Sequence, residues 1–485
     1  MTRPADTASP GYLDAIRAQF LGDPEEPVVL HEGRWLTYGE FGQAIEVVRA
    51  RVVERSATGA AIGIEGANDP LALAGIVGVL LAGRCAVPLS PRRFDQEVGI
   101  LQDQLGAVLD RNGKGDARTF GGVVEHLPTP LGELSLTVLD EDLGGDPDVA
   151  LLLGTSGTTG EPRRIPILHR TIDAGIAALR VGNAGVARRQ DVNVTCFPMY
   201  HLAGLIPSLL TLASGRQLAL LEKFDAATVS DLVQEYEIRS LALTPTTIRM
   251  LLDADVDPAK LATLRFVRSG TAPLSVQLAQ AFQDCYGVPA IQAYGQTEAG
   301  GEVIGWSPED VRAHLRDKAG AVGRPRPGIE VRITEPGLAE PTEAVPAGTI
   351  GELWLRGVQG ADRWQRSGDL ASTDTDGFIW VHGRADDMIL CGGFNIHPAQ
   401  LEQVLEQHDG VLEAAVTGVD DDRLGQVPVA VVVTVNGVEE ATLDAWCRAN
   451  LEPYQCPRRY VRVGQLPRTD TGKVHRPSLE KLARA

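Results

Sequence analysis

The most informative stretch of the sequence is a loop rich in glycine, serine and threonine that follows the apolar run Val149–Leu153. After Gly154 the loop residues are Thr155, Ser156, Gly157, Thr158, Thr159 and Gly160. Backbone N–H groups and hydroxyls with little steric bulk suit the oxygens of a phosphate. Two adjacent arginines, Arg163 and Arg164, follow. The loop is neither a Walker loop nor a dinucleotide fingerprint, and taken alone it is more often an ordinary polar turn.

Further segments downstream carry residue types that suit nucleotide and acyl chemistry. They are Pro198–Gly204 with His201, Ser269–Pro273 with small residues, Tyr294–Glu298 with a ring, a hydroxyl and a carboxylate, Ser367–Asp369 with an acid in a turn, and Leu466–Lys473 with a lysine after a glycine turn. Each alone has an ordinary explanation, such as a core histidine, a turn cap or a surface charge. Their meaning comes from their occurrence in one order behind the loop.

Composition restricts the class of protein. The chain has 485 residues and a net charge of −19, which indicates more than one domain and argues against a general nucleic-acid or anionic-membrane surface. The six cysteines are scattered without a Cys-x-x-Cys pair, as in a reduced cytoplasmic protein. The N-terminus has no apolar signal core, and the longest apolar stretch, Leu71–Gly83, is too short to span a bilayer. We therefore expect a cytoplasmic protein and no membrane partner.

The elements that position these segments are predicted from short apolar runs that alternate with helical patterns. The expected strands include 60–64, 86–89, 218–221, 240–243 and 264–269, with helices over 226–236 and 275–286 between them. This alternation predicts an α/β fold with layers of largely parallel sheet. Closely spaced strands near 331–333, 351–356 and 378–382 predict a β subdomain, and a small α+β domain follows. The predicted domains are residues 1–385 and 386–485.

The set of motifs closely resembles the adenylate-forming superfamily, which contains acyl-CoA ligases, peptide-synthetase adenylation domains and luciferases. The resemblance extends from about Trp35-Leu36-Thr37-Tyr38 to Lys473. In that family a carboxylic acid attacks ATP to give an acyl-AMP and pyrophosphate, and a thiol then displaces AMP. The turn Asp386-Asp387-Met388-Ile389 is similar to that of the acyl-CoA ligase branch. The resemblance implies ATP or acyl-AMP, CoA and Mg²⁺ as ligands.

The same resemblance assigns roles to the motif residues. The loop Thr155, Ser156, Gly157, Thr158 and Thr159 would hold phosphates; Tyr294, Ala272 and Pro273 would bind adenine, and Asp369 and Arg384 the ribose. Thr297 would contact the α-phosphate, Glu298 would be the Mg²⁺ ligand, and Lys473 would bridge carboxylate and phosphate during adenylation. His201, with Gly270 and Thr271, would border the acyl pocket or the thiol channel.

The small domain is implied to rotate about a hinge at Asp386. One orientation would deliver Lys473, and the other would bring Gly392 and Gly393 to the pantetheine tunnel. Tyr454 stands where such enzymes contact the CoA nucleotide, although Gln455 occupies a neighbouring position that is often lysine.

The chain departs from the family where the loop normally ends in Lys-Gly, because it has Arg163-Arg164. A guanidinium at the glycine position would crowd the β- and γ-phosphates, although it could instead bind pyrophosphate. The favoured hypothesis is thioester formation from acyl-AMP and CoA with adenylation weak or lost, so that a separate adenylating enzyme supplies the acyl-AMP. Arg164→Gly, alone or with Arg163→Lys, should then raise adenylation.

Three alternatives stay open beside this hypothesis. The chain is a complete two-step ATP-dependent ligase, an enzyme that loads a carrier protein, or a degenerate binding protein. The apolar and small residues in 199–205, 270–272 and 292–293 favour a bulky apolar carboxylic acid as the substrate.

Overall fold

The computed structural model describes residues 11–111, 123–155, 163–182, 191–435, 438–469 and 473–485. The chain divides into two compact units. One contains Met1–Leu241, Ala259–Leu264 and Gln296–Gly301, and the other contains Ala242–Pro258, Arg265–Gly295 and Glu302–Ala485. Strands and helices alternate through much of both units, so the predicted α/β class is confirmed.

The largest sheet lies in the first unit and has the strand order β6-β7-β5-β3-β4-β8-β9. Its strands are β3 (Ala61–Glu65), β4 (Cys85–Leu89), β5 (Ala107–Arg111), β6 (Val123–Thr129), β7 (Gly132–Val138), β8 (Val149–Thr155) and β9 (Arg163–Leu168). Strands β3, β4, β5 and β8 are parallel, as predicted. The outer strands β6, β7 and β9 pair antiparallel with their neighbours.

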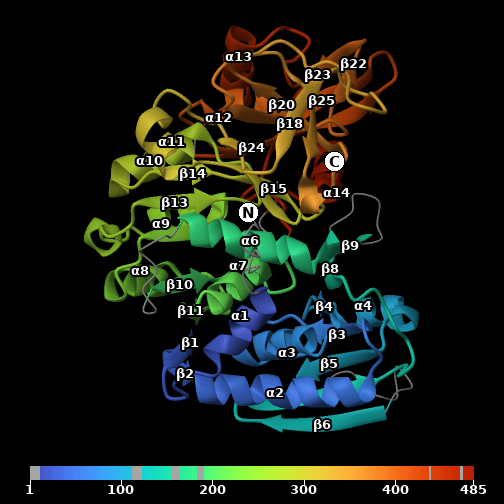
Figure 1. Ribbon diagram of the computed structural model, residues 1–485. Coiled ribbons are helices and arrows are strands. Elements are labelled where there is room, and N and C mark those ends of the chain that lie inside the picture. Colours follow the sequence, from blue (N-terminus) through green and yellow to red (C-terminus); the bar gives the residue numbers. More distant parts are fainter. Residues whose placement is uncertain (1–10, 112–122, 156–162, 183–190, 436–437, 470–472) are drawn as a thin grey trace, which may run out of the picture. The chain divides into compact units, whose positions relative to one another are not determined.

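Helices between the parallel strands cover this sheet. Helix α3 (Pro70–Leu81) joins β3 to β4, and α4 (Phe94–Leu101) joins β4 to β5. All residues of α3 are buried, which explains its uniformly apolar sequence. Helix α2 (Tyr38–Arg55) lies alongside α3 (Figure 1). A Cβ on Gly78 would lie 2.8 Å from the Cβ of Val48, so the close approach of the two helices requires glycine at that position.

A second sheet of the first unit has the order β10-β11-β1-β2. Its strands are β1 (Pro27–His31), β2 (Arg34–Thr37), β10 (Val192–Thr195) and β11 (Gln217–Leu220). The helices α1 (Tyr12–Gln19), α6 (His169–Gly182) and α7 (Leu202–Ala213) pack on one another, and α8 (Ala226–Glu235) follows β11. The buried Tyr12 hydroxyl lies 2.9 Å from Nδ1 of His169, which joins α1 to the helix that follows β9.

In the second unit, two parallel strands lead to two of the predicted motifs. The sheet order is β12-β13-β14, with β12 (Ser240–Leu243), β13 (Phe266–Ser269) and β14 (Ala290–Gln292). Helices α9 (Pro245–Asp253) and α10 (Val276–Tyr286) pack together, and the Tyr286 hydroxyl donates to the Leu251 carbonyl at 2.7 Å.

The predicted β subdomain is an antiparallel sheet. It contains β18 (Glu330–Thr334), β19 (Gly351–Arg356), β20 (Gln365–Thr373) and β21 (Ile379–Arg384) in that order. A smaller sheet with the order β15-β16-β17 precedes it, built from β15 (Tyr294–Gln296), β16 (Gly301–Gly305) and β17 (Arg324–Pro325), with α11 (Pro308–His314) after β16.

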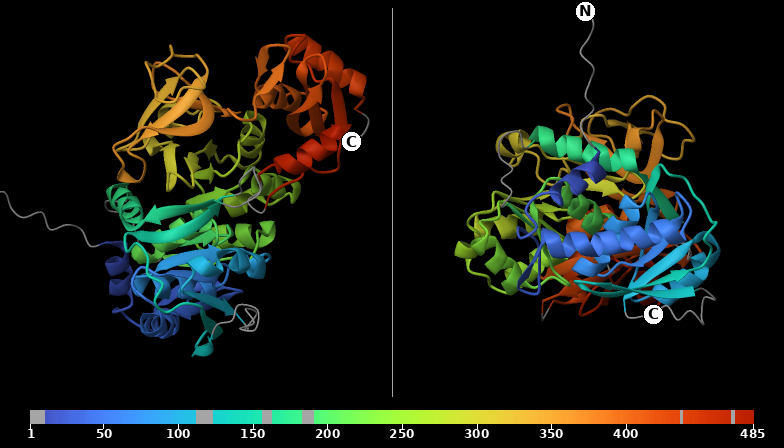
Figure 2. Two further views of the ribbon diagram at one scale, coloured as in Figure 1. Left: turned by 90° about the vertical axis from the view of Figure 1, so that its right-hand side faces the viewer. Right: turned by 60° about the horizontal axis from the view of Figure 1, so that its bottom comes forward.

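Residues 389–485 form a further α+β segment, coloured orange to red in Figure 2. Its strands are β22 (Ile389–Cys391), β23 (Phe394–Ile396), β24 (Val411–Asp421), β25 (Gly425–Thr434) and β26 (Arg459–Arg462); its helices are α12 (Pro398–Glu406), α13 (Glu440–Asn450) and α14 (Arg476–Arg484). Two apolar clusters of this segment are made only of its own residues.

Two further expectations concern the whole chain. Cys85, Cys391, Cys447 and Cys456 are buried, and all six cysteines are free thiols. Among the described residues, the helices are too short or too polar to cross a bilayer.

Candidate active site

Asp369 and Arg384 face each other on the hairpin of β20 and β21, where their Cα atoms are direct partners. The Arg384 guanidinium donates to Oδ1 of Asp369 at 3.3 Å and to the Ser367 carbonyl at 3.3 Å. Asp369 is 7% exposed, and its backbone N–H donates to the Ser367 hydroxyl at 3.0 Å. Gly368 has φ +75°, and a Cβ there would lie 2.8 Å from Nη2 of Arg384. Glycine suits this position because of its positive φ, and a Cβ there would press on the guanidinium.

Tyr294, on β15, joins this pair from a distant part of the chain. Its hydroxyl donates to Oδ2 of Asp369 at 2.5 Å. Burial raises the pKa of the Tyr294 phenol, and the negative charge of Asp369 raises it further. The phenol is therefore protonated at neutral pH and acts as a donor. The structure thus brings together three of the five residues that the sequence assigns to adenine and ribose, the other two being Ala272 and Pro273.

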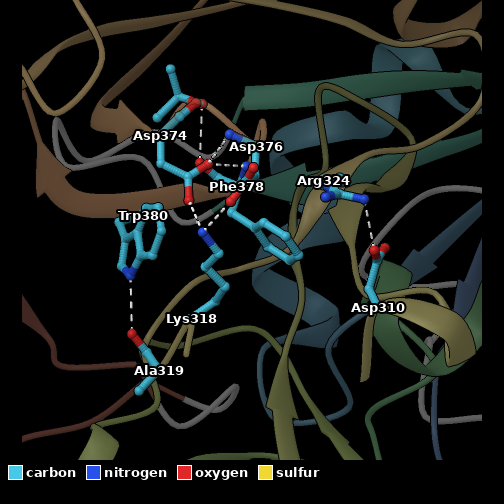
Figure 3. A network of polar contacts seen from close by, with 9 residues as sticks. Asp310, Lys318, Ala319, Arg324, Asp374, Asp376, Phe378 and Trp380 are labelled. Atoms are coloured by element: carbon cyan, nitrogen blue, oxygen red, sulfur yellow. Dashed lines mark hydrogen bonds and ion pairs between the residues drawn. The ribbon is translucent and has the colours of Figure 1, made fainter. Parts of the chain in front are cut away.

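The far end of the same hairpin is fixed by a network of charges and rings (Figure 3). The Lys318 ammonium donates to Asp374 and to Asp376, each at 2.6 Å. Both hydrogen bonds raise the pKa of Lys318, and the one to Asp374 has the larger effect. Asp374 also accepts the Phe378 backbone N–H at 2.9 Å, and the Arg324 guanidinium lies 4.3 Å from the centre of the Phe378 ring. The network holds the turn that joins the strands of Asp369 and Arg384.

The Ser269–Pro273 segment is coupled to Tyr294 through backbone hydrogen bonds. Ser269 ends β13 and pairs with Gln292 on β14. Its carbonyl accepts the Ala293 N–H at 2.8 Å, next to Tyr294 in the chain. Thr271 has φ +70°, an unusual conformation for a β-branched residue that commonly marks a functional loop. The segment predicted to line the adenine slot and Tyr294, which is predicted to bind adenine, therefore follow the ends of two adjacent strands.

Thr297 and Glu298 follow directly after β15. The Thr297 carbonyl accepts the Gly300 N–H at 2.9 Å in a tight turn, and Glu298 is exposed. The described residues contain no cluster of three or more acidic, histidine or cysteine side chains suited to a metal ion. A single carboxylate is nevertheless compatible with Mg²⁺, which usually binds one or two protein carboxylates together with substrate phosphates.

Glu302 was not anticipated from the sequence. Its carboxylate accepts from Arg268 at 3.0 Å and from Nε of Arg326 at 2.7 Å. Arg268 lies on β13 directly before Ser269, so Glu302 joins the strand of the small-residue segment to the strand β16. Its position four residues after Glu298 could have drawn attention to Glu302, although nothing in the sequence indicated which residues it would contact.

The phosphate loop is described only at its two ends. Ser156, Gly157, Thr158 and Thr159 lie outside the described residues, and for Thr155 and Arg163 only the backbone is described. Strands β8 and β9 pair so that Thr155 opposes Arg163 and Gly154 opposes Arg164. The Arg164 guanidinium forms an ion pair with Glu97 on α4, with 2.6 Å between Nη2 and Oε2.

His201 lies at the start of α7. It is the residue before Leu202, and its carbonyl accepts the N–H groups of Gly204 and Leu205 at 3.1 Å each. Its ring lies 4.5 Å from that of Tyr200, and the residue is partly buried. Met199 and Leu205 of the same segment are fully buried in the apolar core. Both side chains therefore pack in the apolar core.

The glycines predicted to approach CoA form the turn between β22 and β23. Gly392 has φ +58° and Gly393 has φ +85°, conformations that favour glycine. Phe394 follows them, is 53% exposed, and stacks on Tyr454 with 4.3 Å between ring centres and 19° between planes. The structure therefore joins the two segments predicted to bind CoA. The exposed Phe394 was missed, although an aromatic residue after a glycine turn was a usable signal.

Gln455, the residue that stands where the family often has lysine, has an internal role. It is 8% exposed, and its side-chain amide donates to Oε1 of Gln400 on α12 at 3.1 Å. Its Oε1 also accepts the Glu452 N–H at 3.1 Å.

Lys473 and Asp386 are both exposed, and Asp386 lies in a turn. The Lys473 carbonyl accepts the Thr469 N–H at 2.7 Å. Ala385, the residue before Asp386, donates its N–H to the Gly368 carbonyl at 2.9 Å. The proposed hinge therefore starts from the hairpin that carries Asp369. Arg476 on α14 pairs with Asp387 at 3.2 Å and with Glu402 at 3.4 Å.

Comparison with known proteins places these motifs in a family. Residues 16–362 match the model of the AMP-binding enzyme family, and residues 400–473 match the AMP-binding enzyme C-terminal domain. A feruloyl-CoA synthase of an Amycolatopsis species is 31% identical over 479 residues, which are 93% of this chain and 94% of that protein. A 2-succinylbenzoate–CoA ligase of Bacillus cereus is 30% identical over 346 residues, 68% and 69% of the two chains.

A solved structure supports the fold over almost the whole length. ATP-bound MatB from Rhodopseudomonas palustris superposes with a TM-score of 0.84 at 24% identity, covering 97% of this chain and 98% of that chain. Because the family models match most of the chain, and the relatives are acid–thiol ligases, the chain belongs to the AMP-binding enzyme family of the adenylate-forming superfamily, in its acyl-CoA ligase branch.

Proposed function

We propose that this enzyme forms an acyl-CoA thioester from an acyl-adenylate and CoA, and that its own ATP-dependent adenylation is weak or lost. The observation that carries the proposal is the environment of Arg164 at the end of the phosphate loop. The guanidinium lies against Gly154 and is bound to Glu97, so it adds bulk beside the loop while its charge is already compensated.

The two half-reactions place different demands on the site. In adenylation a carboxylate oxygen of the acid attacks the α-phosphorus of ATP, and the bond to pyrophosphate breaks. In thioesterification the thiolate sulfur of CoA attacks the acyl carbon, the bond from that carbon to the AMP oxygen breaks, and AMP leaves. Only the first step needs the β- and γ-phosphates, so obstruction of the loop would spare the second.

The described residues support retention of an acyl-AMP. Tyr294 presents its ring beside Asp369, and its hydroxyl and the Arg384 guanidinium orient the two oxygens of that carboxylate. A carboxylate held from both sides is pre-organised to accept the ribose hydroxyls in charge-assisted hydrogen bonds. If adenylation occurs at all, Mg²⁺ would be bound by Glu298 and the phosphates, and would neutralise charge on the leaving pyrophosphate.

The acid is proposed to be bulky, apolar and aromatic. Two sequence relatives are named for aromatic acids, ferulate and 2-succinylbenzoate. The small residues Gly270 and Thr271 and the partly buried His201 are proposed to border the acyl group, as in the sequence analysis.

The thiol step is proposed to use residues 386–485 as a unit that rotates about Asp386. The separate apolar clusters of residues 389–483 support the view that this segment is held together by its own core. The Gly392-Gly393 turn and the stacked pair of Phe394 and Tyr454 then offer an exposed aromatic surface to the CoA end. CoA is preferred to a carrier-protein thiol because the matched relatives are CoA ligases.

A direct test uses the position that departs from the family. Arg164→Gly, Arg163→Lys and the double variant are assayed for ATP–pyrophosphate exchange with a panel of aromatic acids, beside the native chain. The proposal expects exchange to rise in the variants, while the rate with supplied acyl-AMP and CoA stays within about twofold, on the order of 0.4 kcal/mol. Equal exchange in the native chain and the variants would show that the loop tolerates both arginines, and the enzyme would then be a complete two-step ligase.

A further inference from the structure

The chain on the N-terminal side of Asp386 is fixed to the hairpin of β20 and β21. Ala385 directly follows β21 and donates its N–H to the Gly368 carbonyl at 2.9 Å. Arg384, one residue earlier, is the strand partner of Asp369 and also contacts it through its guanidinium. The backbone up to Ala385 is therefore held to the hairpin.

The chain on the C-terminal side of Asp386 is fixed by an ion pair. Oδ2 of Asp387 lies 3.2 Å from Nε of Arg476, the first residue of α14. The two side chains are 24% and 27% exposed, so the pair is partly shielded from water. Strand β22 then begins at Ile389 and pairs with β23 and β25. Asp387 is therefore joined to the small domain, residues 386–485, directly after the exposed Asp386.

Arg476 is itself anchored to two other elements of the small domain. Its Nη1 donates to the Val416 carbonyl on β24 at 2.9 Å and lies 3.4 Å from Oε1 of Glu402 on α12. The same Oε1 accepts the Val416 N–H at 2.8 Å. The planar guanidinium can bind these groups and Asp387 at once, because its N–H groups point in fixed and different directions. One side chain therefore joins the turn after Asp386 to α12, β24 and α14.

We propose that Arg476 is a positioning residue of the hinge, which holds Asp387 to the small domain and thereby confines the rotation to Asp386. This inference rests on the proposed function, because it assumes that residues 386–485 rotate between two orientations. With Ala385 held to the hairpin and Asp387 held to α14, Asp386 is the residue between the two anchors. A hinge of one residue defines the axis of rotation, since the change falls on the φ and ψ of that residue.

The proposal predicts that one substitution rescues another. Asp386→Pro fixes φ near −65° and should lower thioester formation from supplied acyl-AMP and CoA by about tenfold or more. Asp387→Ala releases the next residue from Arg476, so the φ and ψ of that residue can take over part of the rotation. Asp386→Pro with Asp387→Ala should therefore be about three- to tenfold faster than Asp386→Pro alone. A purely structural role of the ion pair predicts that the double variant is no faster than Asp386→Pro.

Arg476→Lys provides a second variant, because it keeps the positive charge and removes the planar fork. A single ammonium replaces the separate Nε and Nη1 donors, so it cannot hold Asp387 and the Val416 carbonyl in the same way. We expect Arg476→Lys to rescue Asp386→Pro by a similar factor. Combining it with Asp387→Ala should give no further rescue, because both changes break the same contact.

Glu413 on β24 provides a matched control in the same domain. It pairs with Arg468 at 2.6 Å, and the two side chains are 30% and 26% exposed, close to the values for the hinge pair. Glu413→Ala thus removes a comparable carboxylate that does not contact the turn at Asp386. It should not rescue Asp386→Pro. Rescue equal to that by Asp387→Ala would indicate a general loosening of the small domain and would overturn the inference.

Hydrogen–deuterium exchange followed by mass spectrometry tests the anchor without catalysis. The backbone amides of residues 386–389 should exchange about threefold faster or more in Asp387→Ala than in the native chain, and at the native rate in Glu413→Ala. Unchanged exchange in Asp387→Ala would overturn the inference. The absence of rescue by both Asp387→Ala and Arg476→Lys would overturn it equally.

The outcomes are separable from those for the proposed function. Normal thioester formation by Asp386→Pro refutes the proposed rotation and this inference with it. A native chain that forms no thioester from acyl-AMP refutes the proposed function, and the exchange experiment then decides whether Arg476 holds Asp387. A slow Asp386→Pro that neither second change rescues refutes only the role of Arg476.

Discussion

Asp369→Asn tests the nucleotide site most sharply, because the change keeps the shape of the side chain and removes its charge. The Asp369 carboxylate accepts from the Tyr294 hydroxyl at 2.5 Å and from Arg384 at 3.3 Å, and these contacts orient its two oxygens. Each carboxylate oxygen can accept more than one hydrogen bond. Loss of the charge-assisted bonds to the ribose should weaken acyl-AMP binding by about 1.5–3 kcal/mol, or roughly ten- to hundredfold.

The assay is titration of the native chain and the variant with a stable acyl-AMP analogue and with its 2′-deoxy counterpart. The native enzyme should prefer the ribose form, and Asp369→Asn should lose most of that preference. Tyr294→Phe is the matched control, because it removes the hydroxyl that orients Asp369 and keeps the ring. We expect it to cost about 0.5–1.5 kcal/mol for both analogues. An unchanged affinity in Asp369→Asn, together with a lower Tm, would reduce Asp369 to a turn residue and refute the reasoning.

Four further expectations follow from the geometry. Asp386→Pro fixes φ near −65° at the hinge and should keep acyl-AMP binding while thioester formation falls; normal thioester turnover would contradict the rotation. Lys473→Ala should leave conversion of supplied acyl-AMP nearly intact, and a large loss in that assay would contradict its role in adenylation. Lys318→Met should lower the Tm, because Asp374 and Asp376 lose their shared cation; an unchanged Tm would mean that the network adds nothing. Burial raises the pKa of Glu406 to about 7, so folding favours the protonated side chain. The stability that this gives is fully present below the ordinary carboxyl pKa and is lost as the pH rises through 7. Glu406→Gln should therefore raise the Tm at pH 8 more than at pH 5, and equal changes at the two pH values would refute the assignment.

The fold was largely predictable because its strands and helices are strongly apolar and regularly spaced. The expected strand over 60–64 is β3 (Ala61–Glu65), and the expected helix over 275–286 is α10 (Val276–Tyr286). The antiparallel strands β6, β7 and β9, which flank the parallel strands of the sheet, were not anticipated. Hydrophobic patterns indicate that a strand exists, whereas its partner is chosen by connection length and packing.

The candidate site divides in the same way. Tyr294, Asp369 and Arg384 could be named from motifs, and the structure brings them together although Tyr294 and Asp369 are far apart in the chain. Glu97 could not be named, because it lies far upstream of Arg164 in an unremarkable helical segment and only the sheet topology brings the two together. Gln455 is a different case. The resemblance drew attention to this position because it is often lysine, and in the structure the glutamine makes an internal hydrogen bond.

The most direct test of the account measures both half-reactions on one preparation of the native chain. One aliquot receives an aromatic acid, MgATP and labelled pyrophosphate, and the other receives the corresponding acyl-AMP and CoA. We expect rapid formation of acyl-CoA and AMP in the second aliquot, with pyrophosphate exchange near background in the first. Exchange as fast as thioester formation would contradict the central claim, because it would show that the phosphate loop binds and uses the triphosphate despite Arg163-Arg164.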